Sequence, residues 1–249
     1  MQGSKMKALR VNLQHAVVTL TAGAFLATTA SAAVRPQLTR IVAYADQKET
    51  PVEILNESSA DYMVQAWLED TKGNDSNIPL VLTPPVMKLG GQKQGKLRLV
   101  VIPAEIPQDR ESVYWLSIQE IPPKAEMSNK LVVAIRSRLK VFVRPKGLNY
   151  EDATKAVKTL TWQVERDGNG TWLKASNPSN YYVSFGKLKL AQSGKAAVML
   201  NDKYEMPAPH ASQRYAVPKG FSAGKATITW SGMNDYGGEG EDQKAEVTL

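Results

Sequence analysis

The sequence offers few residues that could carry out covalent or metal chemistry. It contains no cysteine and only two histidines in 249 residues. The lack of Cys excludes thiol catalysis, Cys-ligated zinc, iron–sulfur clusters and disulfides. His15 lies in an N-terminal segment that we expect to be removed, and His210 lies in a Pro-rich loop. A metal centre or a catalytic triad needs several converging partners, so we predict no metal, no cofactor and no enzyme activity.

Two further motifs suggest catalysis but lack the necessary context. Residues 90–96 (GGQKQGK) fit the start of a phosphate-binding loop, yet Leu97 stands where Ser or Thr would hold magnesium. The residues that follow alternate like a β-strand, whereas a phosphate-binding loop must open a helix. The adjacent carboxylates Glu69 and Asp70 lie in a turn-like context. Such neighbours are far more often solvated charges than an acid–base pair.

The first 32 residues are typical of a secretory signal peptide. A basic start (Lys5, Lys7 and Arg10) contains no acidic residue and precedes a mostly apolar stretch. Ala30-Ser31-Ala32 then supplies the small residues that a signal peptidase reads. We therefore expect cleavage after Ala32 and export of the rest of the chain.

The apolar stretch is too short for a membrane anchor. Its cleanest run, residues 16–30, contains four Thr and falls short of the roughly 20 apolar residues of a spanning helix. We therefore expect no membrane insertion. Three of the 31 basic residues leave with this segment, which lowers the net charge from +7 to +4. A weak and dispersed charge predicts no nucleic-acid partner, which would require a clustered basic face.

The body of the chain has the pattern of an all-β fold. Short β-branched and aromatic runs are separated by Gly, Pro, Asn and Asp, and only residues 151–158 have a helical pattern. Asp167-Gly168-Asn169-Gly170 predicts a hairpin tip. The lengths and spacing favour β-sandwiches. The predicted strands span residues 39–44, 62–68, 96–102, 113–118, 131–143, 159–165, 181–190 and 226–230.

Two sandwich domains fit the length of the chain. A long strand ends at Arg144-Pro145-Lys146-Gly147, where Pro and Gly interrupt the pattern. We place one domain at residues 33–146 and the other at 150–249, each close to the about 100 residues of an immunoglobulin-like sandwich. The second domain is expected to end its strand set at residues 226–230, followed by a short tail.

The strand predicted at residues 131–143 has an unusual alternation. Leu131, Val133 and Ile135 are apolar at odd positions, and cations follow at even positions. A central sandwich strand would bury the odd positions in the core. An edge strand would instead offer them to a partner, because unpaired edges accept an added strand. The pattern alone leaves both interpretations open.

Residues 107–115 (PQDRESVYW) and 118–123 (IQEIPP) resemble the signature of the PapD-like periplasmic pilus chaperones. Ser117 stands where that family usually has Asn. Further matches occur in the expected order, so the resemblance spans nearly the whole chain after residue 32. They are residues 38–42, 66–70, 83–86, 140–145, 161–162, 177–178, 181–183, 212–214 and 234–237.

The resemblance implies a fold and a function. The fold would be two immunoglobulin-like sandwiches at an angle with a cleft between them. The protein would bind pilus (fimbrial) subunits in the bacterial periplasm and deliver them to an outer-membrane usher. It would stabilise each incomplete subunit by lending a strand, which is called donor-strand complementation. The short stretch between Pro123 and Leu131 resembles the short-loop branch (a short F1–G1 loop). Because an unpaired edge strand can pair with a second copy of the chain, a self-capping homodimer is also expected to be possible.

The resemblance also assigns roles to individual residues. Arg40 and Lys140 match the pair that anchors the C-terminal carboxylate of the subunit. Two fixed cations hold a carboxylate through charge-assisted hydrogen bonds. The apolar residues Leu131, Val133 and Ile135 match the donated strand. An interdomain salt-bridge set with a structural role is formed by Glu111, Arg144 and Asp235.

Two other functions are possible for a chain with this pattern. A secreted immunoglobulin-like adhesin or pilus structural subunit would share the fold, but a subunit would lack its own last strand and polymerise. A secreted enzyme or carbohydrate-binding domain could use the five Trp residues, although Trp scattered through strands more often belongs to cores. The sequence favours the chaperone.

Overall fold

The computed structural model describes residues 32–124, 133–200 and 205–249. Residues 33–249 belong to one compact unit. Most of the predicted signal peptide and Leu131 lie outside the described residues. Within the described ranges, no helix has the length and apolar character needed to cross a membrane.

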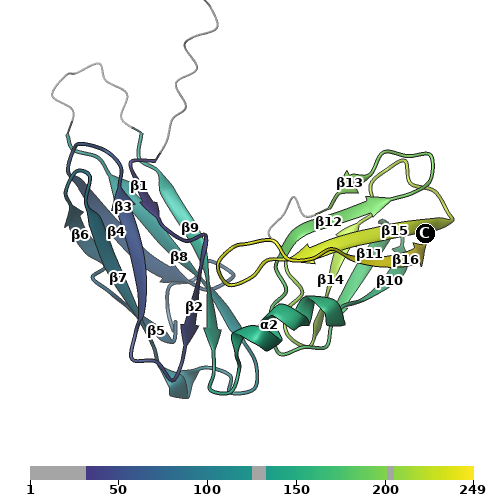
Figure 1. Ribbon diagram of the computed structural model, residues 1–249, viewed down its shortest axis with the longest axis horizontal. Coiled ribbons are helices and arrows are strands. Elements are labelled where there is room, and N and C mark those ends of the chain that lie inside the picture. Colours follow the sequence, from purple (N-terminus) through teal and green to yellow (C-terminus); the bar gives the residue numbers. More distant parts are fainter. Residues whose placement is uncertain (1–31, 125–132, 201–204) are drawn as a thin grey trace, which may run out of the picture. The chain divides into compact units, whose positions relative to one another are not determined.

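The first sandwich contains two sheets that enclose one core (Figure 1). One sheet has the order β1-β3-β7-β5, with β1 Val34–Pro36, β3 Thr50–Asn56, β7 Gln94–Val101 and β5 Leu80–Thr83. The other has the order β2-β9-β8-β4-β6, with β2 Arg40–Tyr44, β9 Arg136–Arg144, β8 Ser112–Ile121, β4 Tyr62–Glu69 and β6 Val86–Leu89. A short 3-10 helix, η1 Pro103–Glu105, precedes β8.

The second sandwich also has two sheets around its own core. One has the order β10-β11-β14, with β10 Thr161–Asp167, β11 Gly170–Asn177 and β14 Ala211–Ala216. The other has the order β13-β12-β15-β16, with β13 Val198–Met199, β12 Phe185–Ala191, β15 Lys225–Gly232 and β16 Gln243–Thr248. Helical turns α2 Tyr150–Ala156 and η2 Val157–Thr159 precede β10. The all-β prediction is confirmed.

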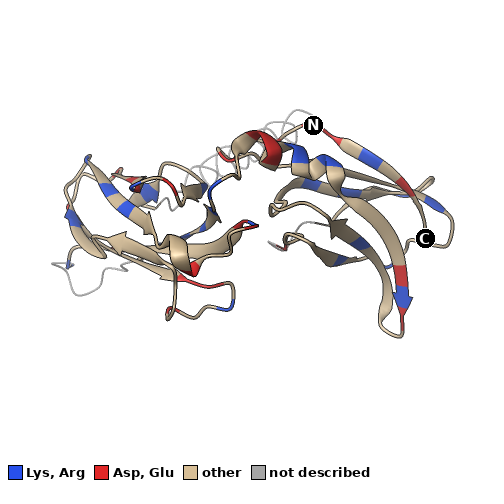
Figure 2. Cartoon of the chain, turned by 90° about the horizontal axis from the view of Figure 1, so that it is seen from below, with Lys and Arg blue, Asp and Glu red and all other residues tan. Residues whose placement is uncertain are grey.

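Alternation along the strands builds each core. In β4, Val64, Ala66 and Leu68 are buried, and the residues between them are not. Leu116 and Ile118 of β8 meet them from the neighbouring strand. Side chains that alternate along a strand point to opposite faces, so one face packs and the other stays in solvent. Figure 2 shows the charged residues spread along the strands and loops of both sandwiches.

Several local predictions agree with the structure. The hairpin tip joins β10 to β11, where Asp167 is paired with Gly170. The helical pattern at residues 151–158 corresponds to α2 and η2. Asn149 caps α2 by accepting a hydrogen bond from the Asp152 N–H through its side chain. Residues 90–96, which fit the start of a phosphate-binding loop, lead into β7. This element is a strand that begins at Gln94, and not the helix that such a loop requires.

Several strand predictions were wrong in extent, and the strand predicted at 181–190 begins only at Phe185. The strand predicted at 131–143 begins only at Arg136, and Val133–Ile135 are described without strand pairing of their own. A further correction concerns the last strand, which is β16 and not residues 226–230. In β16 only Val247 is buried. Strand β16 lies at the edge of its sheet, paired only with β15, and edge strands commonly carry charged and polar residues. Its sequence therefore lacks a clear apolar alternation.

Candidate functional site

Parallel pairing of β2 with β9 places Arg40 beside Lys140. Each residue begins the paired stretch on its strand, which continues to the pair Tyr44 and Arg144. Arg40 is 7% exposed, although Arg is seldom so deeply buried. The structure therefore brings together the two cations that the resemblance assigned to the anchor.

Burial is costly for these two charges. Burial, together with the neighbouring Arg40 charge, lowers the pKa of Lys140 to about 8. Burial also lowers the pKa of Arg40, against the opposing influence of Asp235. An anion bound between them would favour the charged form of both side chains. The pair is therefore suited to hold a carboxylate.

A cavity of about 580 Å³ opens onto the two cations. Arg138 of β9 stacks on the Trp115 ring at 4.5 Å, and the Lys140 ammonium lies 5.9 Å from the same ring. The cavity thus has a cationic wall beside an aromatic and thioether wall. Its lining residues are Thr39, Arg40, Trp115, Arg138, Lys140, Ser184, Phe185, Glu205, Met206 and Met233.

The Arg40 guanidinium makes weak contacts in this cavity. Its Nη2 donates to the Sδ of Met233 at 3.0 Å. Its buried Nε has no hydrogen-bond partner among the residues that the structure describes. A thioether is a weak acceptor. Arg40 therefore keeps strong donor capacity for an anion.

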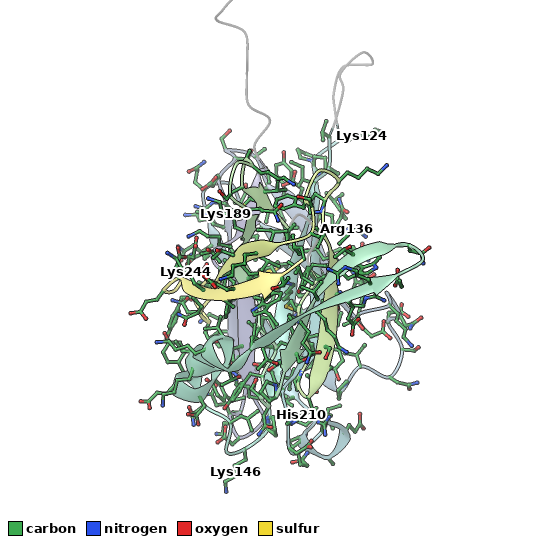
Figure 3. The ribbon with its side chains drawn as sticks, turned by 90° about the vertical axis from the view of Figure 1, so that its right-hand side faces the viewer. Lys124, Arg136, Lys146, Lys189, His210 and Lys244 are labelled. Atoms are coloured by element: carbon green, nitrogen blue, oxygen red, sulfur yellow. The ribbon has the colours of Figure 1, made fainter. Side chains whose placement is uncertain are left out.

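The part of β9 before Lys140 has an open edge. Residues 136–139 pair with β8 on one side, while the pairing with β2 begins only at Lys140. In Figure 3, Arg136 lies in the upper half of the molecule and Lys146, just beyond β9, lies at the bottom. On the side that faces β2, the backbone groups of residues 136–139 have no strand partner within the described ranges. This edge can accept another strand.

The predicted donor residues lie just before this edge. Val133 is 58% exposed, and Ile135 is half-buried. The Glu120 N–H donates to the Ile135 carbonyl at 3.0 Å, which extends the contact with β8. The Ile135 N–H in turn donates to the Glu120 carboxylate at 3.3 Å. The C-terminal half of β9 differs, because Leu139, Val141 and Val143 are buried in the core.

The last cation on β9, Arg144, is fully paired. Its Nε donates to Glu111 at 2.8 Å, and its two Nη atoms donate to Asp235 at 2.6 and 2.7 Å. Nη1 also donates to the Tyr44 hydroxyl at 2.9 Å. The Tyr182 N–H donates to the other Glu111 oxygen at 2.9 Å. The three predicted network residues are therefore in contact.

The pKa values of this network reflect both pairing and burial. Burial alone would lower the pKa of Arg144, but bonds to Asp235 and Glu111 outweigh this effect and raise it. Burial raises the pKa of Glu111 to about 7, against the lowering effect of Arg144. Removing one partner would leave a buried charge without compensation.

Sequence reasoning missed several residues around the two sites. Met233 and Trp115 contact the anchor cations, and Tyr44 contacts Arg144. Tyr182 contributes through its backbone N–H, which no side-chain pattern could reveal. The one available signal was alternation in β8, which places Trp115 on the face opposite Leu116.

Comparison with known proteins identifies the family. A model of the pili and flagellar-assembly chaperone PapD N-terminal domain matches residues 33–149. A model of the pili assembly chaperone PapD C-terminal domain matches residues 155–244.

Individual relatives agree with this match. The chaperone FimB/FhaD of Bordetella pertussis is 37% identical over 211 residues, which cover 80% of this chain and 82% of that protein. The chaperone MrkB of Klebsiella pneumoniae is 33% identical over 81% of this chain and 86% of its own length. The crystal structure of the YadV chaperone has a TM-score of 0.73 and 30% identity, covering 86% of this chain and 100% of that one.

These matches confirm the predicted immunoglobulin-like sandwich fold and disfavour the adhesin and enzyme interpretations. They extend across both sandwiches, including the strands that carry Arg40, Lys140 and Arg144. The chain belongs to the PapD-like family of pilus assembly chaperones, which are not enzymes.

Proposed function

We propose that this chaperone captures pilus subunits by donor-strand complementation and delivers them to an outer-membrane usher. The observation that carries the proposal is the open edge of β9 beside the buried Arg40 and the half-buried Lys140. An incomplete subunit lacks a strand, and a free edge can replace one. Backbone hydrogen bonds would supply affinity, and alternating side chains would supply specificity.

In this mechanism, Arg40 and Lys140 hold the C-terminal carboxylate of the subunit. Both cations line one cavity, and burial lowers the pKa of each because it disfavours the charged form. A carboxylate offers two oxygens to these donors, so each contact is charge-assisted. The subunit strand then runs along residues 136–139, where β2 leaves room.

The apolar residues Val133 and Ile135, with Leu131 before them, would fill the groove of the subunit. The exposure of Val133 supports this role, since a side chain that is 58% exposed gains from burial in a partner. The same exposed strand would support a self-capping homodimer when no subunit is present.

The remaining parts serve location and geometry. We propose that residues 1–32 are a cleaved signal peptide that directs the chaperone to the periplasm. Domains at 33–146 and 150–249 would be joined by the structural network of Glu111, Arg144 and Asp235. Support comes from the two separate cores and from the bonds of Arg144 to both partners.

Co-purification from the periplasm tests the anchor. A tagged chaperone is co-expressed with a pilus subunit, and the captured subunit is quantified for Arg40→Ala and Lys140→Ala. Both changes should abolish capture, because each removes a charged donor. Lys146→Ala is the matched control, since Lys146 is exposed just beyond β9. Unchanged capture by both anchor variants would show that the assignment is wrong.

A second pair of variants tests the donor strand. Ile135→Glu should weaken the complex more than Ala134→Glu, because neighbouring residues point to opposite faces. Size-exclusion chromatography of free Ile135→Glu should also show less self-association. Equal effects at both positions would contradict the proposed facing. Delivery is tested by pull-down of the chaperone–subunit complex with an usher, with free chaperone as the control.

A further inference from the structure

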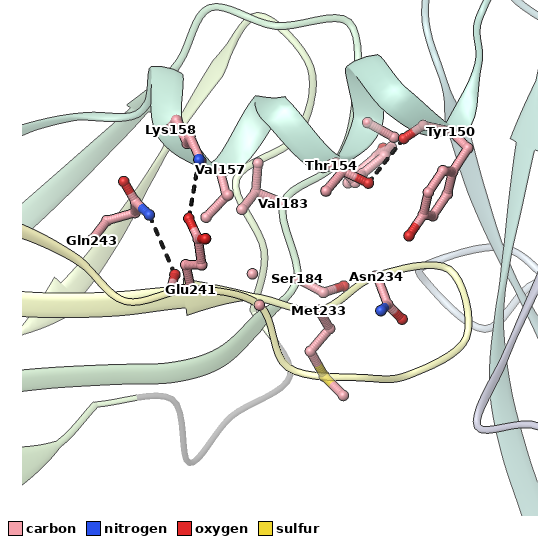
Figure 4. Close-up of a pocket in the computed structure, with 14 residues that line it drawn as sticks. Tyr150, Thr154, Val157, Lys158, Val183, Ser184, Met233, Asn234, Glu241 and Gln243 are labelled. Carbon is pink, nitrogen blue, oxygen red and sulfur yellow. Dashed lines mark hydrogen bonds and ion pairs between the residues drawn. The ribbon is translucent and has the colours of Figure 1, made fainter.

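Met233 is held in a fixed position at the anchor cavity. Its N–H donates to the Ser184 carbonyl at 2.9 Å, and its Sδ accepts from Arg40. The loop that follows is tied by the Asn234 side chain, which accepts from the N–H groups of Tyr236 and Gly238. Figure 4 shows the Met233 side chain pointing away from α2. The sulfur is therefore positioned by the fold.

One close approach adds to this positioning. Gly237 has φ +84, and a Cβ at this position would collide with the Thr39 hydroxyl. Only Gly tolerates both the backbone conformation and the contact. Thr39 directly precedes Arg40, so the Met233 loop is packed against the strand that carries the anchor.

The chemistry of the Arg40–Met233 contact depends on the oxidation state of sulfur. A thioether accepts hydrogen bonds weakly. A sulfoxide is polar and carries an oxygen that accepts strongly. Met233 is half-buried and lines the open cavity, so a small peroxide can reach its sulfur.

We propose that Met233 is an oxidation site at which a peroxide switches off the carboxylate anchor. The sulfur takes one oxygen atom from hydrogen peroxide and is oxidised by two electrons, while the peroxide is reduced to water. The new oxygen accepts a hydrogen bond from Arg40 and so competes with the subunit carboxylate for the same donor. Methionine sulfoxide reductases reverse this modification. The proposal rests on the function proposed above for Arg40.

A ligand-free experiment tests the first step. The purified protein is treated with hydrogen peroxide, and mass spectrometry follows the gain of one oxygen at Met233. NMR of 15N-labelled Arg side chains, assigned with Arg40→Ala, reports on the guanidinium. Exchange of the Arg40 side-chain protons should slow several-fold after oxidation. If Met233 is oxidised and the Arg40 signals do not change, the proposal is wrong.

Binding of a model peptide tests the consequence. The probe is a short alternating Thr-Val peptide with a free C-terminal carboxylate, compared with its C-terminal amide. Oxidation of the wild type should reduce affinity for the carboxylate peptide by about tenfold or more, because a charge-assisted bond is lost. Met233→Leu should be insensitive to peroxide. Met233→Ile replaces it if the Leu variant is unstable.

Matched controls separate this site from other methionines. Met206→Leu keeps Met233 and should lose affinity like the wild type, although Met206 lines the same cavity. Met63→Leu and Met199→Leu remove exposed methionines and should also stay sensitive. Equal loss in Met233→Leu would overturn the proposal. If the untreated protein binds carboxylate and amide peptides alike, the anchor assignment fails, and the NMR experiment still decides on Met233.

Discussion

The two cation sites of the β2–β9 pair use the same residue types for opposite purposes. Arg144 is bonded to two carboxylates and a tyrosine hydroxyl. Arg40, beside Lys140, donates to a thioether and retains a buried Nε without a hydrogen-bond partner among the described residues. Arg144 has hydrogen-bond partners within the chain, so it holds the elements that carry these partners together. Arg40 is buried without comparable compensation, which is the condition for binding an anion.

The largest expected effect is at the satisfied site. Arg144→Met leaves Glu111 buried beside an apolar side chain, so the free energy of unfolding should fall by about 3–5 kcal/mol. Urea unfolding followed by circular dichroism measures the change. The double variant Glu111→Gln with Arg144→Met should recover part of the loss. A loss below about 1 kcal/mol, typical of exposed pairs, would show that the network is not a buried constraint.

The next effect is a pH dependence at the anchor. The pKa of Lys140 is lowered to about 8 in the free protein, and a bound carboxylate raises it. Affinity for a carboxylate peptide should be constant below pH 8 and fall by up to about tenfold per pH unit above it, because binding then requires proton uptake. Isothermal titration calorimetry measures this.

The matched variant for this prediction is Lys140→Arg. An Arg side chain keeps its charge throughout that pH range. Its affinity should therefore be independent of pH from 8 to 10. If the wild type shows no pH dependence in this window, Lys140 does not contact the carboxylate.

A smaller effect isolates one hydrogen bond of the satisfied site. Tyr44→Phe removes the hydroxyl that accepts from Arg144 and keeps the ring, which lies 5.6 Å from the guanidinium. We expect a loss of about 1 kcal/mol in thermal or urea unfolding. Tyr236→Phe is the control, because Tyr236 is 72% exposed and should change stability little. Equal losses would contradict the role of the Tyr44 hydroxyl.

The smallest expected effect is at the anchor itself. Arg40→Met should leave the free energy of unfolding unchanged or raise it by up to about 1 kcal/mol, because a buried charge with only weak compensation from Asp235 is removed. Subunit capture should nevertheless be lost. A large loss of stability would remove the distinction between the two sites. Differential scanning calorimetry with Lys146→Met as the control provides this measurement.

Local patterns predicted much of the fold but not its pairing. Alternation identified β4 and β8, and the Asp-Gly-Asn-Gly turn identified the β10–β11 hairpin. Strand β16 was missed because one buried Val provides little periodic signal. Parallel pairing of β2 with β9 joins residues 100 positions apart. No local pattern specifies such a register, so only the family resemblance suggested that Arg40 and Lys140 belong together.

The site was predictable to the extent that it consists of charged side chains. Glu111, Arg144 and Asp235 were placed together by the resemblance, and the structure shows them in contact. The sequence did not identify Met233 as a residue of the site, since one Met in a loop has no characteristic spacing. Its role depends on the distance to Arg40, which is a tertiary property. The donor role of Leu131, Val133 and Ile135 stays a prediction, which the variants described above test.

Glu120 has a consequence for how the molecule bears mechanical load. Its buried carboxylate accepts from the Val34 N–H at 2.7 Å and from the Ile135 N–H at 3.3 Å, using one oxygen for each. This carboxylate therefore links residues 133–135 to β1 of the opposite sheet, in addition to the backbone hydrogen bond between Glu120 and Ile135. A Gln could accept only one of these bonds. A pull on residues 133–135 by an attached strand would thus be shared, through Glu120, between both sheets of the sandwich.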